Sequence, residues 1–143
     1  MKDENAFMSP DQVQRVLDSS PFIRFLQLSC ERIDADGGRL SLSMPVRTEL
    51  ERIGGTGQFH GGPIAALLDA AGCFGVMMKT GGSVPTINFR VDYLRPAGGA
   101  RLVGDALVRR VGRAVGVVDV DVFDDQGRLT AVGRGCFGTS IGS

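Results

Sequence analysis

The segment from Gly57 to Gly72, GQFHGGPIAALLDAAG, holds the only histidine of the chain and one carboxylate, Asp69, inside a run of small and apolar residues. A carboxylate can activate water or attack a carbonyl carbon directly. Burying an unpaired carboxylate costs several kcal/mol, so we expect Asp69 to be partnered, solvated or functional. The plainer alternative is that Asp69 caps a neighbouring turn or pairs with an arginine across an interface.

The sequence His60-Gly61-Gly62-Pro63 is typical of a helix start. Free backbone N–H groups and the positive end of the helix dipole there can bind an anion or a developing oxyanion. Glycine lets a substrate approach the backbone, and Pro63 fits the first turn because it has no N–H to satisfy. His60 and Asp69 lie nine residues apart, on the order of 12 Å along a helix axis. If both serve one site, a second copy of the helix is the simplest source of the missing group, which favours a symmetric dimer with composite sites.

We predict that a central helix carries these residues. It runs from Gly62 to about Lys79, with a glycine C-cap in the following TGGS. The apolar stretch 64–78 inside it is too short to span a bilayer and suits a core helix. A helical wheel separates two faces, and we expect the bulky one to point into a sheet and Asp69 to line a crevice. The bulky face is Leu67, Ala71, Phe74 and Met78. The other face holds Asp69 with Ala65, Gly72, Cys73 and Val76.

The first half of the chain predicts a helix over Pro10–Ser19, with Ser9 as N-cap and Gln12 completing a capping box. A short apolar turn or second helical piece follows in PFIRFLQ. Two strands then flank a hairpin turn at 36–38, which is Asp-Gly-Gly. The polar, glycine-rich stretch RTELERIGGTGQF is expected to be a loop that leads to the central helix.

The second half predicts four long strands, at 86–96, 101–111, 114–124 and 129–140, with turns at Gly112-Arg113 and DDQGR. In the first of them Ile87, Phe89, Val91 and Tyr93 alternate with polar residues, which indicates a half-buried strand. Strands joined by short turns are antiparallel neighbours. The expected fold class is α+β: one domain over residues 1–143, with an antiparallel sheet wrapped around one long helix and an N-terminal helix within residues 1–20.

Composition narrows the function classes. The chain has 143 residues and a formal net charge of zero, which argues against a nucleic-acid partner. Its three cysteines are far apart and lack metal-ligand spacing, so we expect reduced, mostly buried thiols, no metal site and a cytoplasmic protein. The N-terminal ten residues have no apolar core of a secretory signal, and no membrane association is expected.

One combination of residues resembles a known family. The pattern His60-Gly61-Gly62 … Leu68-Asp69, then Thr86 and a strand ending Tyr93-Leu94-Arg95-Pro96-Ala97, is similar to the PaaI-like (phenylacetic-acid-pathway) hotdog thioesterases. The resemblance covers roughly residues 20 to 138. It implies the hotdog fold and an acyl-CoA hydrolase that assembles as a homodimer or a tetramer made of two dimers. Coenzyme A would be part of the substrate, and no separate cofactor is implied.

The resemblance also implies roles for individual residues. Asp69 would be the nucleophile or general base, and the Gly61 N–H of the partner subunit would polarise the thioester carbonyl. His60 would position that carbonyl or orient the loop, and Thr86 would help to hold the attacking water. The expected substrate contacts are Gly62, Gln58, Arg95 and Arg113, the two arginines as candidates for the CoA phosphates.

Gly54 departs from the family pattern, because members usually carry Asn or Gln six positions before the histidine. Thr56 or Gln58 are the candidates to compensate. This departure keeps open a non-catalytic acyl-CoA-binding domain. A hotdog hydratase or dehydratase that acts on an acyl thioester is a further alternative.

Overall fold

The computed structural model describes residues 8–140, so the predictions that concern residues 1–7 and 141–143, including the lack of a secretory signal, lie outside it. Six antiparallel strands form one sheet in the order β1-β2-β4-β5-β6-β3. The elements are α1 Pro10–Ser19, α2 Pro21–Leu26, β1 Ser29–Asp34, β2 Arg39–Pro45, the 3-10 helix η1 Thr48–Leu50, α3 Gly61–Thr80, β3 Thr86–Tyr93, β4 Arg101–Val111, β5 Val115–Asp124 and β6 Leu129–Gly138.

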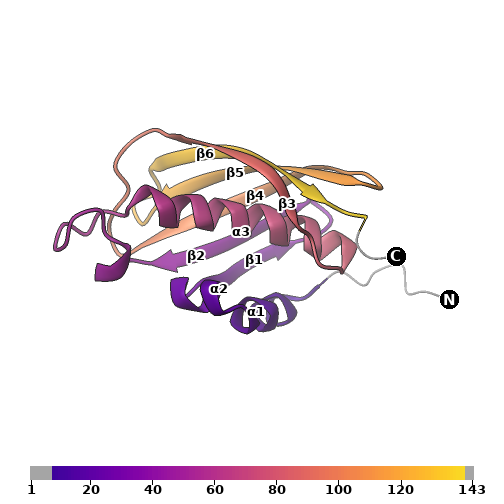
Figure 1. Cartoon of the computed structure of the whole chain (residues 1–143), viewed down its shortest axis with the longest axis horizontal. Coiled ribbons are helices and arrows are strands. Elements are labelled where there is room, and N and C mark those ends of the chain that lie inside the picture. The colour runs from indigo at the N-terminus through magenta and orange to yellow at the C-terminus, as the bar shows by residue number, and fades with distance from the viewer. Residues whose placement is uncertain (1–7, 141–143) are drawn as a thin grey trace.

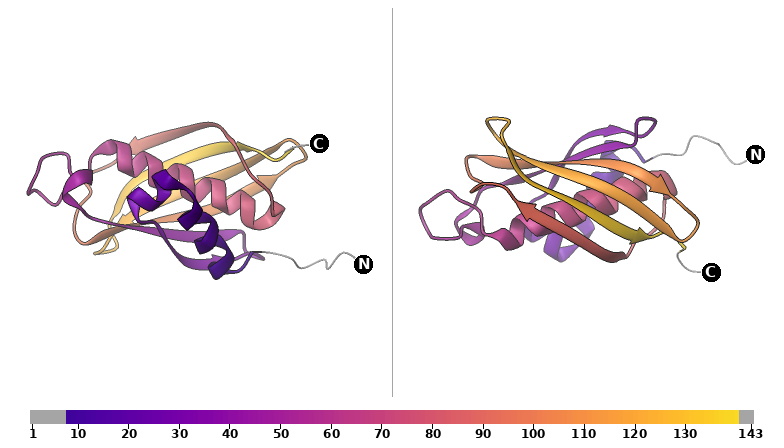
Figure 2. Two further views of the ribbon diagram at one scale, coloured as in Figure 1. Left: turned by 60° about the horizontal axis from the view of Figure 1, so that its bottom comes forward. Right: turned by 90° about the horizontal axis from the view of Figure 1, so that it is seen from above.

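The central helix α3 runs along one face of this sheet, and the sheet curves around it (Figures 1 and 2). It contacts β4 and β5 most, and also β2, β6 and β3. The predicted bulky face is confirmed, since Leu67, Ala71, Phe74 and Met78 are all buried against the strands. The predicted α+β class and the hotdog architecture, one long helix wrapped by an antiparallel sheet, are therefore confirmed.

The local signals at the helix ends also hold. Ser9 and Gln12 form the predicted capping box, with both reciprocal hydrogen bonds present, and α1 spans the predicted residues. The helix α3 begins at Gly61, one residue earlier than predicted, and ends at Thr80. The C-cap is Gly81, whose φ of 73° is the left-handed conformation that glycine adopts readily. The PFIRFLQ piece is helical, as α2. The predicted hairpin turns lie where expected between the strands.

The prediction for the second face of α3 is partly wrong. Gly72 and Val76 are fully buried, and a Cβ on Gly72 would lie 2.6 Å from the Phe137 ring of β6. The partly exposed stripe runs instead along Gly62, Ala65, Ala66, Asp69, Cys73 and Met77. The reason is the curvature of the sheet, which brings strands β2 to β6 against the helix and leaves one strip of it uncovered.

The prediction that β3 is half-buried is wrong for the chain by itself. The side chains of Ile87, Phe89 and Tyr93 are 56%, 39% and 53% exposed. Alternation reports which side chains share a face, but β3 is the edge strand of the sheet and pairs only with β6 within the described residues. An eight-residue edge strand with exposed apolar side chains is an unusual surface for an isolated chain, because such edges pair with other strands.

The helix α3 has 20 residues and is apolar enough, by length and composition, to cross a membrane. The helix is longer than its apolar stretch 64–78, because residues 61–63 and 79–80 are helical as well. The helix is packed against the sheet, however, and half of its 20 residues are buried. The core helix of a protein that folds around it meets the same test, so α3 has the place that the sequence predicts for it.

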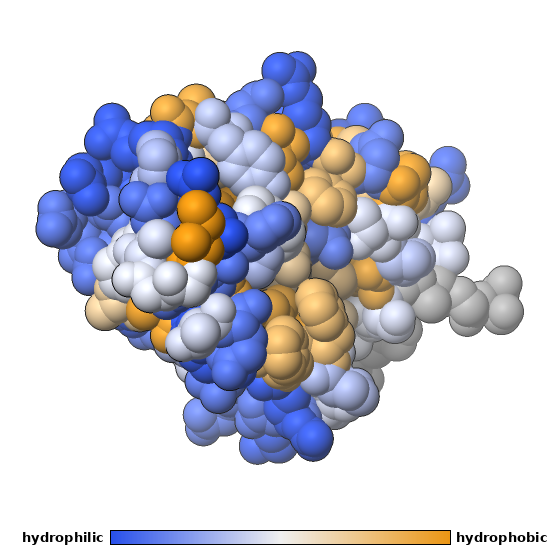
Figure 3. All heavy atoms as spheres, turned by 60° about the vertical axis from the view of Figure 1, so that its left-hand side comes forward, coloured by the Kyte–Doolittle hydropathy of each residue, from blue (hydrophilic) through white to orange (hydrophobic). Residues whose placement is uncertain are grey.

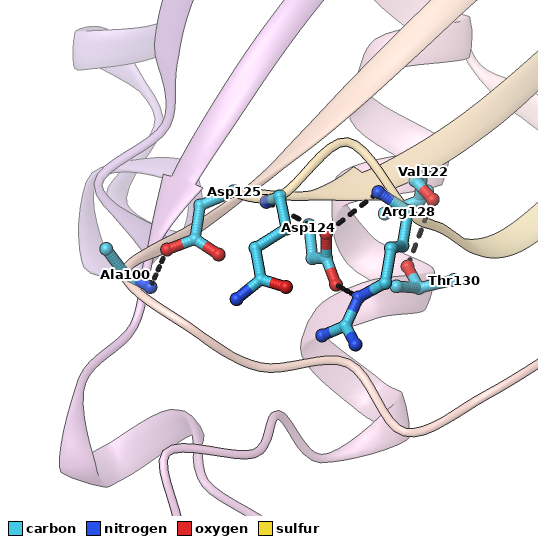
Figure 4. Close-up of polar contacts among 7 residues, drawn as sticks. Ala100, Val122, Asp124, Asp125, Arg128 and Thr130 are labelled. Atoms are coloured by element: carbon cyan, nitrogen blue, oxygen red, sulfur yellow. Dashed lines mark hydrogen bonds and ion pairs between the residues drawn. The ribbon is translucent and has the colours of Figure 1, made fainter.

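The β5–β6 turn is built around a buried carboxylate, Asp124, whose side chain is fully shielded from solvent (Figure 4). It accepts hydrogen bonds from the backbone N–H groups of Gln126 and Arg128 and from Arg128 Nε at 2.7 Å. Burial alone would raise the pKa of Asp124, but these hydrogen bonds and the Arg128 charge outweigh it and lower the pKa below the ordinary 3.8. The ionised Asp124 carboxylate thus stabilises the turn.

Asp124→Asn is expected to lower the melting temperature at pH 7 by about 5 °C, because the amide cannot accept the Arg128 Nε–H while it also serves both backbone donors. A lowered pKa stabilises the fold above the ordinary pKa, and this stabilisation is lost as the pH falls through the folded-state value. The difference in melting temperature between wild type and variant should therefore shrink below about pH 4. The exposed Asp121→Asn is the control. A difference that persists unchanged at pH 3 would contradict this account.

Candidate active site

Asp69 lies in the third turn of α3, half-buried, on the partly exposed stripe. Its Oδ1 accepts a hydrogen bond of 2.7 Å from the hydroxyl of Thr86, the first residue of β3. Its other oxygen, Oδ2, accepts no hydrogen bond from the residues that the structure describes. The structure thus brings together two of the predicted site residues, and it places the carboxylate where one oxygen can meet an incoming molecule.

The start of α3 leaves a single backbone donor unused. His60 is the N-cap, and its Nδ1 accepts a hydrogen bond of 3.2 Å from the Gly62 N–H. Because Nδ1 is an acceptor, the neutral ring carries its proton on Nε2. Pro63 has no N–H. Among the described residues nothing accepts a hydrogen bond from the Gly61 N–H, so this group remains available to an oxyanion.

Tyr93 completes the structure around the helix start, although nothing in the sequence indicated a role for this residue by itself. Its hydroxyl donates a hydrogen bond of 2.7 Å to the carbonyl oxygen of Gly61. The ring borders a hollow of about 370 Å³, whose walls include Phe59, Ile64 and Leu94. The signal that could have identified it is that Tyr93 is the only tyrosine of the chain, at the end of the strand that begins with Thr86.

Asp69 and Gly61 do not meet within one chain. Both lie on the same helix, eight residues apart, which separates them by about 12 Å along its axis. The contact between Thr86 and Asp69 is at one end of β3, and the contact between Tyr93 and Gly61 is at the other. The two halves of the predicted site are therefore tied to opposite ends of the edge strand.

The loop before α3 projects from one end of the molecule, where apolar patches interrupt a largely hydrophilic surface (Figure 3). Gly54 is exposed there, and no atom lies within 4 Å of the position that a Cβ would take. The two residues expected to compensate are engaged inside the loop. Thr56 donates its hydroxyl hydrogen to the Ile53 carbonyl at 2.6 Å, and Gln58 Oε1 accepts from Arg52 at 3.2 Å. Both side chains therefore make their hydrogen bonds within the loop that contains Gly54.

The two candidate phosphate contacts, Arg95 and Arg113, lie toward opposite ends of the sheet. Arg95 is exposed and borders the hollow beside Gly61. Arg113 is exposed in the β4–β5 turn, which is held to the end of β6 by the hydrogen bond from the Thr139 N–H to the Ala114 carbonyl. Because Thr86 pairs with Phe137 of β6, Arg113 lies toward the end of the sheet that holds the Asp69 contact.

Cys73, one turn after Asp69, is not a competing nucleophile. Burial, together with the nearby Asp69 charge, raises the pKa of its thiol to about 12, and the thiol donates to the Val84 carbonyl at 3.1 Å. Cysteine reacts as the thiolate, which is scarce at neutral pH when the pKa is so high. All three cysteines are free and half-buried, less buried than predicted. In residues 8–140 no group of three His, Cys, Asp or Glu side chains could hold a metal ion.

A second, larger hollow of about 1050 Å³ lies on the face of the sheet away from α3 and contains none of the predicted site residues. At its centre Asp119 forms ion pairs with Arg134 and Arg109, both at 2.6 Å. The hydrogen bond from Arg134 is the main cause of a lowered Asp119 pKa. Four arginines and four aspartates line this hollow, so its formal charges balance.

Comparisons with known proteins show what the whole chain is similar to. A family model described as "Thioesterase superfamily" matches residues 56–131. A candidate esterase of Halobacterium salinarum is 38% identical over 87% of this chain and 88% of its own length. The medium/long-chain acyl-CoA thioesterase YigI of Escherichia coli is 28% identical over 74% of this chain and 77% of its own length. A solved structure from the thioesterase superfamily has a TM-score of 0.83 at 33% identity and covers 90% of this chain and 96% of its own.

Proposed function

Since the chain belongs to the thioesterase superfamily, we propose that it hydrolyses acyl-CoA to the free acid and CoA, with Asp69 as nucleophile or general base. The observation that carries this proposal is the half-buried Asp69, held by Thr86 on the one uncovered stripe of an otherwise buried helix. Within residues 8–140, Thr86 is the one hydrogen-bond partner of this carboxylate. The named activity of the E. coli relative, an acyl-CoA thioesterase, supports the substrate class.

The reaction needs two groups on opposite sides of the thioester carbonyl. As a general base, Asp69 takes a proton from the water whose oxygen attacks the carbonyl carbon; as a nucleophile, it attacks that carbon itself and water then hydrolyses the anhydride. In either case the Gly61 N–H stabilises the oxyanion, and the C–S bond breaks to release the CoA thiolate, which takes up a proton. Thr86 holds one carboxylate oxygen and thereby orients the other. His60 caps the helix start that presents the Gly61 N–H.

The partner for this reaction is a second copy of the chain, joined through β3. The free edge of β3 carries exposed apolar side chains, including Ile87 and Phe89, and such an edge is a template for pairing. Two β3 strands related by a twofold axis run antiparallel, so the first residue of one lies beside the last residue of the other. Thr86, bonded to Asp69, would then face the Tyr93 of the other subunit, which is bonded to Gly61.

This arrangement also gathers the remaining candidates at one site. Arg113 lies toward the Asp69 end of its own sheet. Arg95 of the other subunit lies beside the Gly61 that the same subunit would bring to this site. Both are suited to the phosphates of CoA, which arginine binds through paired hydrogen bonds. Gln58 and Gly62 would line the approach to the same helix start. The proposed location is the cytoplasm, in agreement with cysteines that form no disulfide within residues 8–140.

A mixing experiment tests whether the sites are composite. Asp69→Asn and Gly61→Pro each remove one half of the site, and we expect both purified variants to have little activity. Unfolding and refolding them together yields mixed dimers, in which one of the two sites has both an intact Asp69 and an intact Gly61. With random pairing, activity should return to about a quarter of the wild-type value. No recovery, in a mixture shown by mass spectrometry to contain mixed dimers, would contradict composite sites.

The activity itself is tested by thiol release from a panel of aryl, short-chain, medium-chain and long-chain acyl-CoAs. Hydrolysis releases one thiol per acyl group. The exposed Gly54 and the engaged Thr56 and Gln58 favour one alternative, an acyl-CoA-binding domain without turnover. Tight binding of an acyl-CoA with no thiol release from any member of the panel would support that alternative. With a β-hydroxyacyl-CoA, an enoyl absorbance and no free thiol would support a dehydratase.

A further inference from the structure

The Gly61–Gly62 peptide unit is held from both sides. Its carbonyl oxygen accepts the 2.7 Å hydrogen bond from the Tyr93 hydroxyl, and its N–H donates the 3.2 Å hydrogen bond to His60 Nδ1. Two consecutive glycines give this segment more backbone freedom than any other pair of residues would. The two side chains therefore restrict a part of the helix start that its own sequence leaves flexible.

Tyr93 also packs against the same segment. The position that a Cβ would take on Gly61 lies 3.3 Å from the ring and from the hydroxyl oxygen of Tyr93. The ring covers one side of the first helical turn, while the Gly61 N–H has no hydrogen-bond partner among the described residues. An unbonded donor next to a doubly held peptide is what an oxyanion site requires, because the donor must already be oriented when the charge develops.

We propose that Tyr93 is a positioning residue for the Gly61 N–H, acting through its hydrogen bond to the Gly61 carbonyl. This inference rests on the proposed thioesterase function. The hydroxyl does not touch the reacting atoms; it restricts rotation of the backbone around Gly61, so that the N–H keeps the direction needed by the oxyanion. The loss of the hydroxyl should affect the transition state, where charge is on the oxygen, more than the bound thioester.

Tyr93→Phe is the test, since it removes only the hydroxyl and keeps the ring against Gly61. We expect kcat to fall about tenfold with KM changed less than twofold and a melting temperature within about 2 °C of the wild type. Ser19→Ala is the matched control, because Ser19 also donates a hydroxyl hydrogen to a backbone carbonyl at 2.7 Å, on α1. It should leave kcat unchanged.

A double-mutant cycle separates positioning from a general structural role. In a Gly61→Pro background there is no N–H to orient, so adding Tyr93→Phe should lower kcat less than twofold further. A tenfold loss in both backgrounds would overturn the proposal, and so would an unchanged kcat for Tyr93→Phe in the otherwise wild-type enzyme. Failure of the wild type to release thiol from any acyl-CoA would instead overturn the proposed function.

A second measurement does not depend on turnover. The chain has one tyrosine and no tryptophan, so labelling with 3-fluorotyrosine gives a single fluorine resonance, from Tyr93. In Asp69→Asn protein, an acyl-CoA that binds through the Gly61 N–H should shift this resonance. An unchanged resonance at a saturating acyl-CoA concentration, with binding shown by calorimetry, would contradict the proposed link between Tyr93 and the bound carbonyl.

Discussion

Asp69→Asn is expected to lower kcat/KM for acyl-CoA hydrolysis by about 1000-fold, which corresponds to roughly 4 kcal/mol of transition-state stabilisation. The amide has nearly the shape of the carboxylate, and its oxygen can still accept the hydrogen bond from Thr86. What it loses is the ability to accept a proton from water or to attack the carbonyl carbon. The measurement is thiol release under kcat/KM conditions with the best acyl-CoA of the panel.

The matched control for this variant is Asp92→Asn. Asp92 is a partly exposed carboxylate on β3, in an ion pair with Arg90 at 3.1 Å, and it has no place in the proposed chemistry. It should keep kcat/KM within about twofold of the wild type, because exposed ion pairs contribute little. Circular dichroism and the melting temperature of Asp69→Asn show whether its fold is intact. A folded Asp69→Asn protein with the wild-type rate would eliminate the proposed role of Asp69.

Gly61→Pro is expected to lower kcat about 100-fold or more relative to Gly61→Ala, because proline removes the N–H that we assign to the oxyanion. Proline suits the first position of a helix, and His60 already has the extended backbone, φ −65° and ψ 151°, that a residue before proline adopts. The substitution therefore removes the donor with little cost to the helix. Steady-state kinetics on the same acyl-CoA measures the difference.

Gly61→Ala makes the comparison specific. Both variants place a Cβ about 3.3 Å from the exposed ring of Tyr93, so both crowd the same neighbour, but alanine retains the N–H. The ratio of the two kcat values thus separates the effect of losing the Gly61 N–H from the effect of crowding Tyr93. Equal activity of the alanine and proline variants would show that the Gly61 N–H does not serve as the oxyanion donor.

The local signals in the sequence account for much of the fold. The capping box of α1, the left-handed Gly81 after α3 and the turns between strands were all predictable, because each depends on residues within a few positions of one another. The bulky face of α3 was predictable for a related reason: the helical period places Leu67 and Phe74 on one side wherever the helix lies. The resemblance to a family added the hotdog arrangement, which periodicity alone does not specify.

Other features depended on which strands become neighbours. Apolar and polar side chains do alternate along β3. They are exposed because β3 lies at the edge of the sheet, where it pairs with β6 alone among the described strands. Gly72 and Val76 share a wheel sector with Asp69, yet the curved sheet covers them and leaves Asp69 uncovered. Both errors have the same origin: a helical wheel or a strand pattern specifies directions, while burial depends on what the rest of the chain places in those directions.

The sequence by itself determined the chemical groups and the separation that matters most: one carboxylate and one helix start on a single helix, too far apart to act together within one chain. Only the tertiary structure decided how these groups are held. Thr86 follows Asp69 by 17 residues in the chain, Tyr93 follows Gly61 by 32, and the two side chains come from opposite ends of β3. Contacts over such separations arise from strand order and sheet curvature, which no short stretch of residues encodes.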